Sequence, residues 1–451
     1  MRRLFGTDGI RGIANEFLSC ECAMSIGRSL GYILSSNHKY RPRVLVGMDT
    51  RISSEMLASA ISAGLCSVGS DVMMLGVVPT PAVAYLVKKY KAKAGIMISA
   101  SHNPYEYNGI KIFGEDGFKL SDELEEEIES IVLDNTPPIE IAPVSEIGKR
   151  LDVPYARHDY ISYLTSTTDV SLDGMKIAID ASNGAASVTA EELFRTLGAD
   201  VAMLNDKPTG FNINKNCGST HMESLKRYIK EKGLDVGIAF DGDADRCLAI
   251  DECGNQVDGD FIMAILALDM KNKGKLNKNT VVGTVMSNFG FQKFCEENGI
   301  KFIAAKVGDR YVLEVINQDG YSFGGEQSGH IIIRNLATTG DGQLTAIALL
   351  SYIKESGKSL SQLARVMKKY PQHTVNIEAS QEEKIALFTD EEIRALLKES
   401  EKQISDRGRI VVRPSGTEPL IRIMVESSLE SEAKSVAEEL ASSIKKKLSS
   451  Y

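Results

Sequence analysis

The strongest constraint on the fold is an alternation of short apolar segments with helical patterns in the first part of the chain. Residues 44–47, 71–77 and 95–98 are typical of buried strands, and residues 53–68 and 81–90 between them have the apolar spacing of helices. Strands that alternate with helices indicate βαβ units and a mostly parallel sheet. This part of the chain is therefore expected to form an α/β domain.

The same alternation starts again twice. A second series runs from a strand at 175–179 to a strand at 235–240, and a third contains a helix at 260–271 and a strand at 280–286. The tail differs, because short strand patterns are mixed there with helices. We therefore predict an α/β protein with three related mixed α/β domains and a smaller C-terminal α+β domain.

The domain limits follow from length and from punctuating residues. A chain of 451 residues exceeds the size at which one hydrophobic core keeps growing. The segment Asn135–Pro138 and the pair Tyr370-Pro371 are typical of boundaries and linkers. The predicted domains are residues 1–150, 151–255, 256–369 and 370–451.

Three predicted strands run directly into polar loops, at residues 99–104, 241–246 and 324–330. In open α/β sheets, ligands bind outside the carboxyl ends of the strands. We therefore expect the three loops to meet at one site.

The second loop carries aspartates at alternate positions, Asp241, Asp243 and Asp245. They can converge on one cation if the backbone curls, and oxygen ligands favour magnesium, calcium or manganese. An EF-hand, with Glu252 as its twelfth residue, is disfavoured because Arg246 stands where the sixth must be glycine. The same aspartates would also suit an aspartyl-phosphate phosphatase or a solvated acidic turn.

The first loop contains Ser101 beside His102. This pair is not a hydrolase triad, because neighbours in sequence rarely face each other and the chain has no Gly-x-Ser-x-Gly elbow. From its own loop, Ser101 is explained equally well as a helix N-cap or part of a turn before Pro104. A magnesium site elsewhere in the chain shifts the balance toward phosphoryl chemistry.

The remaining polar loops carry weaker signals. The segment Arg413–Pro419 places a guanidinium, two hydroxyls and a glycine in one loop, which can bind phosphate but is also a common turn. Glu326, Ser328 and His330 can hydrogen-bond sugar hydroxyls or can simply end a strand. For two isolated charges, surface solvation is the competing explanation: Lys111 and Arg11.

Composition excludes several classes of protein. With 43% hydrophobic and 25% charged residues the chain belongs with globular proteins, and a net charge of -9 argues against a general nucleic-acid binder. Seven scattered cysteines fit a reducing cytoplasm, and we expect neither a signal peptide nor a membrane partner. There is no Walker A sequence and no Rossmann glycine fingerprint, so nucleotide binding is not predicted.

Taken together, the loops resemble the signature loops of one family, the α-D-phosphohexomutases. They stand in the family's order along the whole chain: Phe5–Gly12, Ser99–Pro104, Asp241–Arg246, Gly324–His330 and Arg413–Pro419. The resemblance implies four domains around a central cleft and an isomerase that moves phosphate between two positions of a hexose phosphate.

Three details are most similar to the bacterial branch of the family that interconverts glucosamine 6-phosphate and glucosamine 1-phosphate on the route to UDP-N-acetylglucosamine. They are the start Phe-Gly-Thr-Asp-Gly-Ile-Arg-Gly, the loop Ser-Ala-Ser-His-Asn-Pro and the loop Glu-Gln-Ser-Gly-His. Mannose and glucose phosphates are the competing substrates.

The resemblance also implies roles for single residues. Ser101 would be a phosphoserine, primed by a sugar 1,6-bisphosphate, and one of its phosphate oxygens would share one Mg²⁺ with the three aspartates. Lys111 is the first candidate for the general acid/base, and His330 or Lys306 is the next. Other cleft and sugar-binding residues would be Arg11, His102, Arg246, Glu326 and Ser328. The phosphate that does not react would be bound by Arg413, Ser415, Gly416 and Thr417.

Family resemblance further suggests a homodimer. Two rival functions remain open at this point. A magnesium-dependent phosphatase would release inorganic phosphate, and a sugar-phosphate sensor would keep the fold without turnover. A mutase is distinguished from both because it should carry one phosphate on the peptide that contains Ser101.

Overall fold

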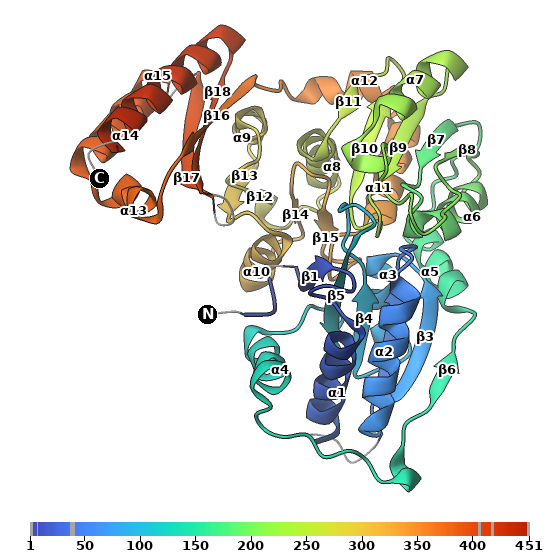
Figure 1. The fold of residues 1–451 in the computed structure, drawn as a ribbon. Helices are drawn as coiled ribbons and strands as arrows, with labels where there is room; N and C mark the ends of the chain where they lie inside the picture. Colours follow the sequence, from blue (N-terminus) through green and yellow to red (C-terminus); the bar gives the residue numbers. More distant parts are fainter. Residues whose placement is uncertain (1–2, 7, 37–40, 405–406, 416–418, 449–451) are drawn as a thin grey trace. The chain divides into compact units, whose positions relative to one another are not determined.

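The computed structural model describes residues 3–6, 8–36, 41–404, 407–415 and 419–448 (Figure 1). Gly416 and Thr417, which were predicted to bind phosphate, lie outside the described residues. By its internal contacts the chain divides into two compact units. Unit 1 comprises Met1–Met286 and Gly299–Val366, and unit 2 comprises Ser287–Asn298 and Met367–Tyr451.

Unit 1 contains three sheets. The first has the order β1-β5-β4-β2-β3-β6, with strands at Ile10–Ile13 (β1), Arg43–Met48 (β2), Asp71–Val77 (β3), Ala94–Ile98 (β4), Tyr107–Gly114 (β5) and Arg150–Asp152 (β6). The second has the order β11-β10-β9-β7-β8, with strands at Lys176–Asp180 (β7), Asp200–Leu204 (β8), Val236–Phe240 (β9), Cys247–Asp251 (β10) and Gln256–Val257 (β11). The third has the order β13-β12-β14-β15, with strands at Thr280–Thr284 (β12), Lys301–Ala305 (β13), Phe323–Gly325 (β14) and Ile331–Ile333 (β15).

The helices of unit 1 lie before, between or after the strands of each sheet along the chain. With the first sheet they are Cys20–Ser36 (α1), Ser54–Ser67 (α2), Thr80–Lys89 (α3) and Asp122–Asp134 (α4). With the second they are Ala156–Thr165 (α5), Ala190–Thr196 (α6) and Glu223–Lys232 (α7). With the third they are Gly259–Asn272 (α8), Asp309–Asp319 (α10), Gly342–Ser356 (α11) and Leu360–Leu363 (α12).

One topological feature recurs in all three sheets. In each sheet, one strand pairs in parallel with the strand on one side and antiparallel with the strand on its other side. The antiparallel strand follows it directly in the chain, after a polar loop. These pairs are β4 and β5, β9 and β10, and β14 and β15. The strand order around this hairpin is also the same in the three sheets. The prediction of three related mixed α/β domains is therefore confirmed, and the three polar loops occupy equivalent positions.

Buried apolar strands hold these loops in place. Every residue of β4 and β9 is buried, as expected for strands covered on both faces. In β5, by contrast, Asn108 and Lys111 are buried polar residues within the sheet. Buried polar groups need partners, so the position of Lys111 already points to a cluster of charges at the end of the first sheet.

Unit 2 is built around the antiparallel sheet β16-β18-β17. Its elements are Phe289–Glu297 (α9), Gln372–Glu378 (β16), Gln381–Thr389 (α13), Glu391–Ile404 (α14), Gly408–Pro414 (β17), Leu420–Ser427 (β18) and Glu430–Leu448 (α15). The buried carboxylate of Glu426 accepts hydrogen bonds from Asn288 Nδ2 and Phe289 N, both at 2.9 Å, and from Arg409 Nε at 2.6 Å. These bonds explain why α9 belongs to unit 2 although its sequence lies between β12 and β13. The predicted smaller C-terminal α+β domain is confirmed.

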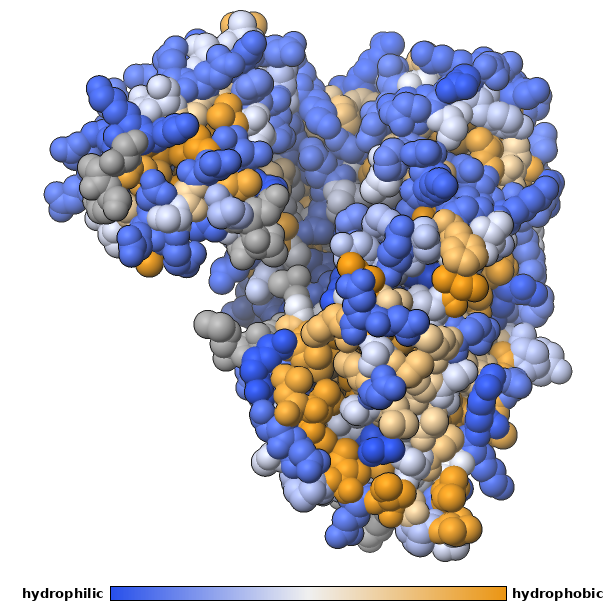
Figure 2. All heavy atoms as spheres, viewed as in Figure 1, coloured by the Kyte–Doolittle hydropathy of each residue, from blue (hydrophilic) through white to orange (hydrophobic). Residues whose placement is uncertain are grey.

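One apolar surface feature lies away from the polar loops. Figure 2 shows hydrophobic residues gathered over α1 and α4, where a groove of about 320 Å³ is lined by side chains such as Leu30, Ile33 and Leu124. All seven cysteines lie among the described residues and are free thiols. No described helix is both long enough and apolar enough to span a membrane.

Asp341 provides a test of the packing of unit 1. Its carboxylate caps α11 by accepting a hydrogen bond from Leu344 N at 2.9 Å, and it accepts another from the Tyr160 hydroxyl at 2.8 Å. Burial raises the pKa of Asp341 to about 6, although both hydrogen bonds oppose the rise. The folded state therefore binds this proton more tightly than the unfolded state. Its contribution to stability is lost as the pH rises from about 4 to about 6.

We expect Asp341→Asn to stabilise the protein near neutral pH, because it removes the buried charge. The amide oxygen can still accept from Leu344 N, and the amide N–H can donate to the hydroxyl oxygen of Tyr160. The variant should exceed the wild type in free energy of unfolding by up to about 3 kcal/mol above pH 6, and by much less at pH 4.5. Urea unfolding at both pH values measures the difference. If the difference in free energy of unfolding between Asp341→Asn and the wild type does not change with pH, the raised pKa of Asp341 is contradicted.

Candidate active site

The three aspartates of the loop between β9 and β10 converge, as predicted. One carboxylate oxygen from each of Asp241, Asp243 and Asp245 lies within 4.8 Å of those of the others, and all three residues are buried. The left-handed conformation of Ala244, with φ of 57°, curls the loop. Three buried carboxylates at this spacing form a site that can bind a metal ion.

The hydrogen bonds of this cluster leave room for a cation. Asp243 Oδ2 accepts hydrogen bonds from Lys111 Nζ at 2.9 Å and from Thr80 Oγ1 at 2.6 Å, whereas its Oδ1 is buried without a hydrogen-bond partner. Asp245 Oδ1 is likewise buried and lacks a hydrogen bond, although Arg246 Nε lies 3.9 Å from it. Burying carboxylate oxygens without partners is costly. A hard, oxygen-preferring cation such as Mg²⁺ removes that cost, so the donor set fits it.

Ser101 lies against this cluster. Its hydroxyl Oγ donates to Asp241 Oδ2 at 2.6 Å and lies 3.3 Å from His102 Nδ1. Ser101 is only 1% exposed and has a left-handed backbone with φ of 52°, which is uncommon for a serine. Its backbone N–H donates to Ser99 Oγ at 2.9 Å. Ser101 therefore does not cap a helix, and its hydroxyl is directed at the carboxylate of Asp241.

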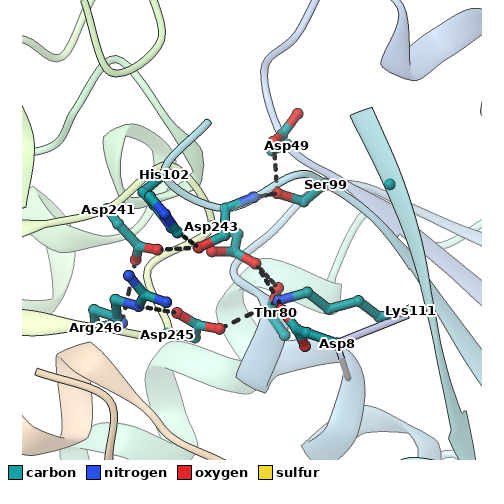
Figure 3. A network of polar contacts seen from close by, with 12 residues as sticks. Asp8, Asp49, Thr80, Ser99, His102, Lys111, Asp241, Asp243, Asp245 and Arg246 are labelled. Atoms are coloured by element: carbon teal, nitrogen blue, oxygen red, sulfur yellow. Dashed lines mark hydrogen bonds and ion pairs between the residues drawn. The ribbon is translucent and has the colours of Figure 1, made fainter. Parts of the chain in front are cut away.

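Lys111 reaches the same carboxylates from β5, as Figure 3 shows. Its Nζ lies 2.9 Å from Asp243, 3.1 Å from Asp8 and 3.2 Å from Asp245. Burial disfavours the ammonium, but these three carboxylates outweigh it and raise the pKa of Lys111 well above its ordinary value. The surface-solvation explanation of Lys111 is therefore wrong, since this side chain is 2% exposed and fully paired.

The ionisation of the other groups follows from the same environment. Burial and repulsion from Asp245 and Asp243 raise the pKa of Asp241 well above its ordinary range. At Asp243, Lys111 and Thr80 overcome the effect of burial and lower the pKa. Burial, reinforced by nearby arginines, lowers the pKa of His102 to about 4, so its imidazole is neutral at pH 7.

An ion-pair chain connects the first and third sheets at this site. Asp8 contacts Lys111 through Oδ2, and its Oδ1 accepts a hydrogen bond from Lys119 Nζ at 2.5 Å. Lys119 also binds Asp309 at the start of α10, and Asp309 Oδ2 lies 3.5 Å from His330 Nε2. Sequence reasoning assigned no role to Asp8, Lys119 or Asp309. Only the place of Asp8 in a signature loop could have drawn attention to it.

The three polar loops of unit 1 meet, as expected from their position in the fold. Cys247 N donates to Gly329 O at 3.0 Å, which joins the second loop to the third. Asn214 Nδ2 donates to Ser101 O at 2.8 Å, which joins the first loop to the second domain. A cavity of about 490 Å³ opens beside them, and the predicted residues among its lining are Arg11, Asp245, Arg246, Glu326 and His330.

The remaining predicted residues are placed as follows. Glu326 accepts a hydrogen bond from Gly308 N at 3.0 Å and lies 3.4 Å from the hydroxyl of Ser328. Lys306 is exposed and its Nζ lies over the ring of Tyr311, 5.6 Å from the centroid. Lys306 does not line the cavity beside the aspartates.

In unit 2, the described part of the predicted phosphate loop is strongly basic. Arg413 on β17 pairs in register with Arg422 on β18, and Lys384 Nζ donates to the carbonyl of Ser415 at 2.8 Å. Like charges directly opposite each other destabilise a sheet unless an anion offsets them. Sequence reasoning missed Arg422 and Lys384, because neither lies within the Arg413 loop.

Comparisons with known proteins agree with this fold and site. Four family models, described as the α/β/α domains I, II and III and the C-terminal domain of phosphoglucomutase/phosphomannomutase, match residues 2–138, 158–254, 258–370 and 374–443. The chain therefore belongs to the phosphoglucomutase/phosphomannomutase family, and the predicted resemblance is confirmed. It is an isomerase of the intramolecular phosphotransferase type.

Among its relatives are proteins named phosphoglucosamine mutase. One from Acetivibrio thermocellus is 53% identical over 426 residues, which are 94% of this chain and 95% of that protein. Another from Thermoanaerobacter sp. is 53% identical over 450 residues, which are 99% of this chain and 100% of that protein.

Solved structures extend the likeness of the fold. A phosphoglucomutase/phosphomannomutase family protein from Burkholderia thailandensis has a TM-score of 0.81 at 20% identity, with 97% of each chain covered. The N-acetylphosphoglucosamine mutase of Aspergillus fumigatus, in complex with GlcNAc-6P and magnesium, has a TM-score of 0.67 at 17% identity, with 98% of this chain and 95% of that chain covered.

The metal site can be tested by substitution. Asp243→Ala removes one of the three carboxylates and the main partner of Lys111 and Thr80. We expect the Mg²⁺ concentration for half-maximal activity to rise by at least about tenfold. Titration of Mg²⁺ into EDTA-treated enzyme measures it, with the exposed Asp169→Ala as the matched control. An unchanged Mg²⁺ requirement in Asp243→Ala would remove this residue from the ligand set.

Proposed function

We propose that the enzyme interconverts glucosamine 6-phosphate and glucosamine 1-phosphate through a phosphorylated Ser101, and so supplies the synthesis of UDP-N-acetylglucosamine. The observation that carries this proposal is the hydroxyl of Ser101, directed at Asp241 beside two further buried carboxylates. The 53% identity to phosphoglucosamine mutases over nearly the whole chain supports the choice of substrate.

Mg²⁺ is proposed to be held by the three aspartates together with an oxygen of the phosphoserine, where it would supply positive charge next to the transferring phosphoryl group. Phosphoryl transfer depends mainly on charge neutralisation and alignment. The residues of this chain therefore have to orient the phosphoserine, bind the sugar and move protons.

In the proposed reaction, a sugar hydroxyl attacks the phosphorus of phosphorylated Ser101. A new bond forms between that oxygen and phosphorus, and the bond between phosphorus and Oγ of Ser101 breaks. The attacking hydroxyl gives up a proton and Oγ takes one. Lys111 is the proposed acid/base, because its Nζ contacts Asp243 and Asp245, which converge with the Asp241 that Ser101 contacts. Mg²⁺ bound by these aspartates would offset the negative charge that raises the pKa of the Lys111 ammonium. His330 is the next candidate.

The product of this first transfer is a sugar 1,6-bisphosphate, which must turn end for end before its other phosphoryl group returns to Ser101. The same bisphosphate would prime an enzyme that lacks the phosphate. Glu326 and Ser328 are proposed to bind the sugar hydroxyls, and Arg11, His102, Arg246 and Lys306 to complete the binding site. The other phosphate is proposed to be held by Arg413, Ser415, Gly416 and Thr417.

Outside the active site, we propose a cytoplasmic enzyme that forms a homodimer and has neither nucleic-acid nor membrane partners. The acidic net charge supports the absence of a nucleic-acid partner.

The decisive experiment assays the glucosamine, glucose and mannose 6-phosphates side by side, each primed with its 1,6-bisphosphate. We expect glucosamine 6-phosphate to give the highest kcat/KM. Intact-mass analysis should find one phosphoryl group per chain, and peptide mapping should place it on the peptide containing Ser101. Inorganic phosphate should not accumulate with turnover. A preference for mannose phosphate would overturn the substrate, and stoichiometric release of phosphate would make the protein a phosphatase.

A further inference from the structure

Arg51 lies between β2 and α2 and has a completely buried side chain. Its Nε donates to Asp49 Oδ2 at 2.8 Å. Its other N–H groups donate to four carbonyl oxygens of a single segment, those of Ser101 and Asn103, both at 2.9 Å, of Tyr107, at 3.0 Å, and of Pro104. A guanidinium has five N–H groups. All five are therefore used, and four of them hold the segment that contains Ser101.

The environment of Arg51 rules out a role as a phosphate ligand. Asp49 is also completely buried and balances the charge of the guanidinium. The same carboxylate accepts a hydrogen bond from Ser99 Oγ at 2.7 Å, and Ser99 Oγ in turn accepts one from the backbone N–H of Ser101. Arg51 thus binds the carbonyl oxygens of the loop, and Asp49 supports the N–H of Ser101 through Ser99. Every N–H group of the guanidinium is used in these bonds, so none remains to bind a phosphate.

The second domain holds two of the same carbonyl oxygens. Asn214 Nδ2 donates to Ser101 O at 2.8 Å and to Asn103 O at 3.0 Å. Gly242, in the loop of the aspartates, packs directly on this peptide, since a Cβ there would lie 2.5 Å from Ser101 O. The carbonyl of Ser101 is therefore fixed by Arg51 and Asn214 at once, and the aspartate loop lies against it.

This support matters because of the backbone of Ser101. A left-handed conformation is unfavourable for a residue with a Cβ and persists only where its surroundings enforce it. The φ of 52° is what turns Oγ of Ser101 toward Asp241. If the carbonyls were released, the loop could relax and move Oγ away from the carboxylates.

We propose that Arg51, together with Asn214, is a positioning residue that holds the Ser101 loop in its left-handed conformation for phosphoryl transfer. The kinetic part of this inference rests on the proposed function. The structural part does not, because the order of the loop can be measured without any turnover.

The test uses Arg51→Lys in the full-length enzyme. Lysine keeps the charge but has only three donors on one nitrogen and cannot replace the fork of the guanidinium. We expect kcat to fall about 100-fold, because small misplacements of reacting groups have effects of that size, while KM for the sugar phosphate stays within about threefold. Amide hydrogen exchange should accelerate in the peptide covering residues 99–107 and remain unchanged in β9.

Asn214→Ala keeps the inference testable if Arg51→Lys does not fold. It removes two of the six hydrogen bonds to these carbonyls, and we expect about a tenfold loss in kcat with the same local acceleration of exchange. Arg195→Lys is the matched control, because Arg195 also donates to a backbone carbonyl, that of Val201 at 2.7 Å, but in α6 away from the site. The control should leave activity and exchange unchanged.

The outcomes separate the two proposals. A wild-type enzyme without mutase activity would refute the proposed function, while faster exchange at residues 99–107 in the variants would still support the positioning role. Wild-type kcat and unchanged exchange in a folded Arg51→Lys or Asn214→Ala variant would overturn the inference. A loss confined to KM would also overturn it, since it would make Arg51 a contributor to substrate binding.

Discussion

Ser101→Ala is expected to abolish turnover, with a loss in kcat on the order of 10⁴-fold or more, because no other described side chain occupies the position of its hydroxyl against Asp241. Alanine removes only the hydroxyl and has similar backbone preferences, so the fold should be retained. Three measurements belong together: steady-state activity, the melting temperature and the phosphoryl content by intact mass. The variant should be folded, inactive and free of phosphate on this peptide.

Two further serine variants serve as controls for Ser101→Ala. Ser29→Ala removes another buried hydroxyl, which donates to Ser25 O within α1, and should leave activity unchanged. Ser99→Ala removes the acceptor for the N–H of Ser101 and should cause an intermediate loss of roughly tenfold. Near-normal mutase activity in Ser101→Ala would refute the role of this residue as the phosphate carrier.

The parts of the fold that sequence could predict are those in which one local pattern dominates. Strands β4 and β9 are continuous apolar runs, so both were predicted within one residue of their observed limits. The antiparallel return strand β5 was not predicted, because Asn108 and Lys111 interrupt its apolar pattern. Those residues are buried there because partners from distant parts of the chain satisfy them.

The end of a helix could not be predicted where its sequence pattern continues beyond the last helical residue. The sequence of residues 359–369 is compatible with one continuous helix, but α12 ends at Leu363 and gives way to a 3-10 turn at Ala364–Val366. Tyr370 precedes Pro371, and a residue before proline is disfavoured in the helical region. The assignment of α9 to unit 2 could not be predicted either, because it depends on the hydrogen bonds of Glu426 across a long sequence separation.

The site shows the same division. The aspartates could be recognised from spacing, since their convergence depends on one short loop. Ser101 could not be distinguished from a turn residue by its own sequence, because its partner Asp241 is 140 positions away. Asp8, Lys119 and Arg51 were assigned no role for the same reason. Each acts through contacts between segments far apart in sequence. Apart from the place of Asp8 in a signature loop, their local sequence does not distinguish them from surface charges.

Lys111→Met should combine a large loss of activity with a loss of stability. The substitution keeps much of the side-chain volume but leaves Asp8, Asp243 and Asp245 without their shared cation. Breaking a buried ion pair in this way costs about 3–5 kcal/mol in free energy of unfolding. We expect kcat to fall by about 10²- to 10⁴-fold if Lys111 transfers a proton. Urea unfolding and steady-state kinetics measure the two effects.

Lys111→Arg separates the electrostatic role from the chemical one. A guanidinium keeps the positive charge between the carboxylates, so most of the stability should return, but it stays protonated and cannot exchange a proton during turnover. We therefore expect Lys111→Arg to be nearly as stable as the wild type and nearly as inactive as Lys111→Met. If the arginine variant recovers most of kcat, Lys111 acts only as a fixed positive charge and His330 becomes the candidate acid/base. If Lys111→Met itself stays within about tenfold of wild-type kcat, Lys111 is essential neither as an acid/base nor as a positive charge. The charge of the carboxylates that it contacts must then be balanced in the working enzyme by Mg²⁺.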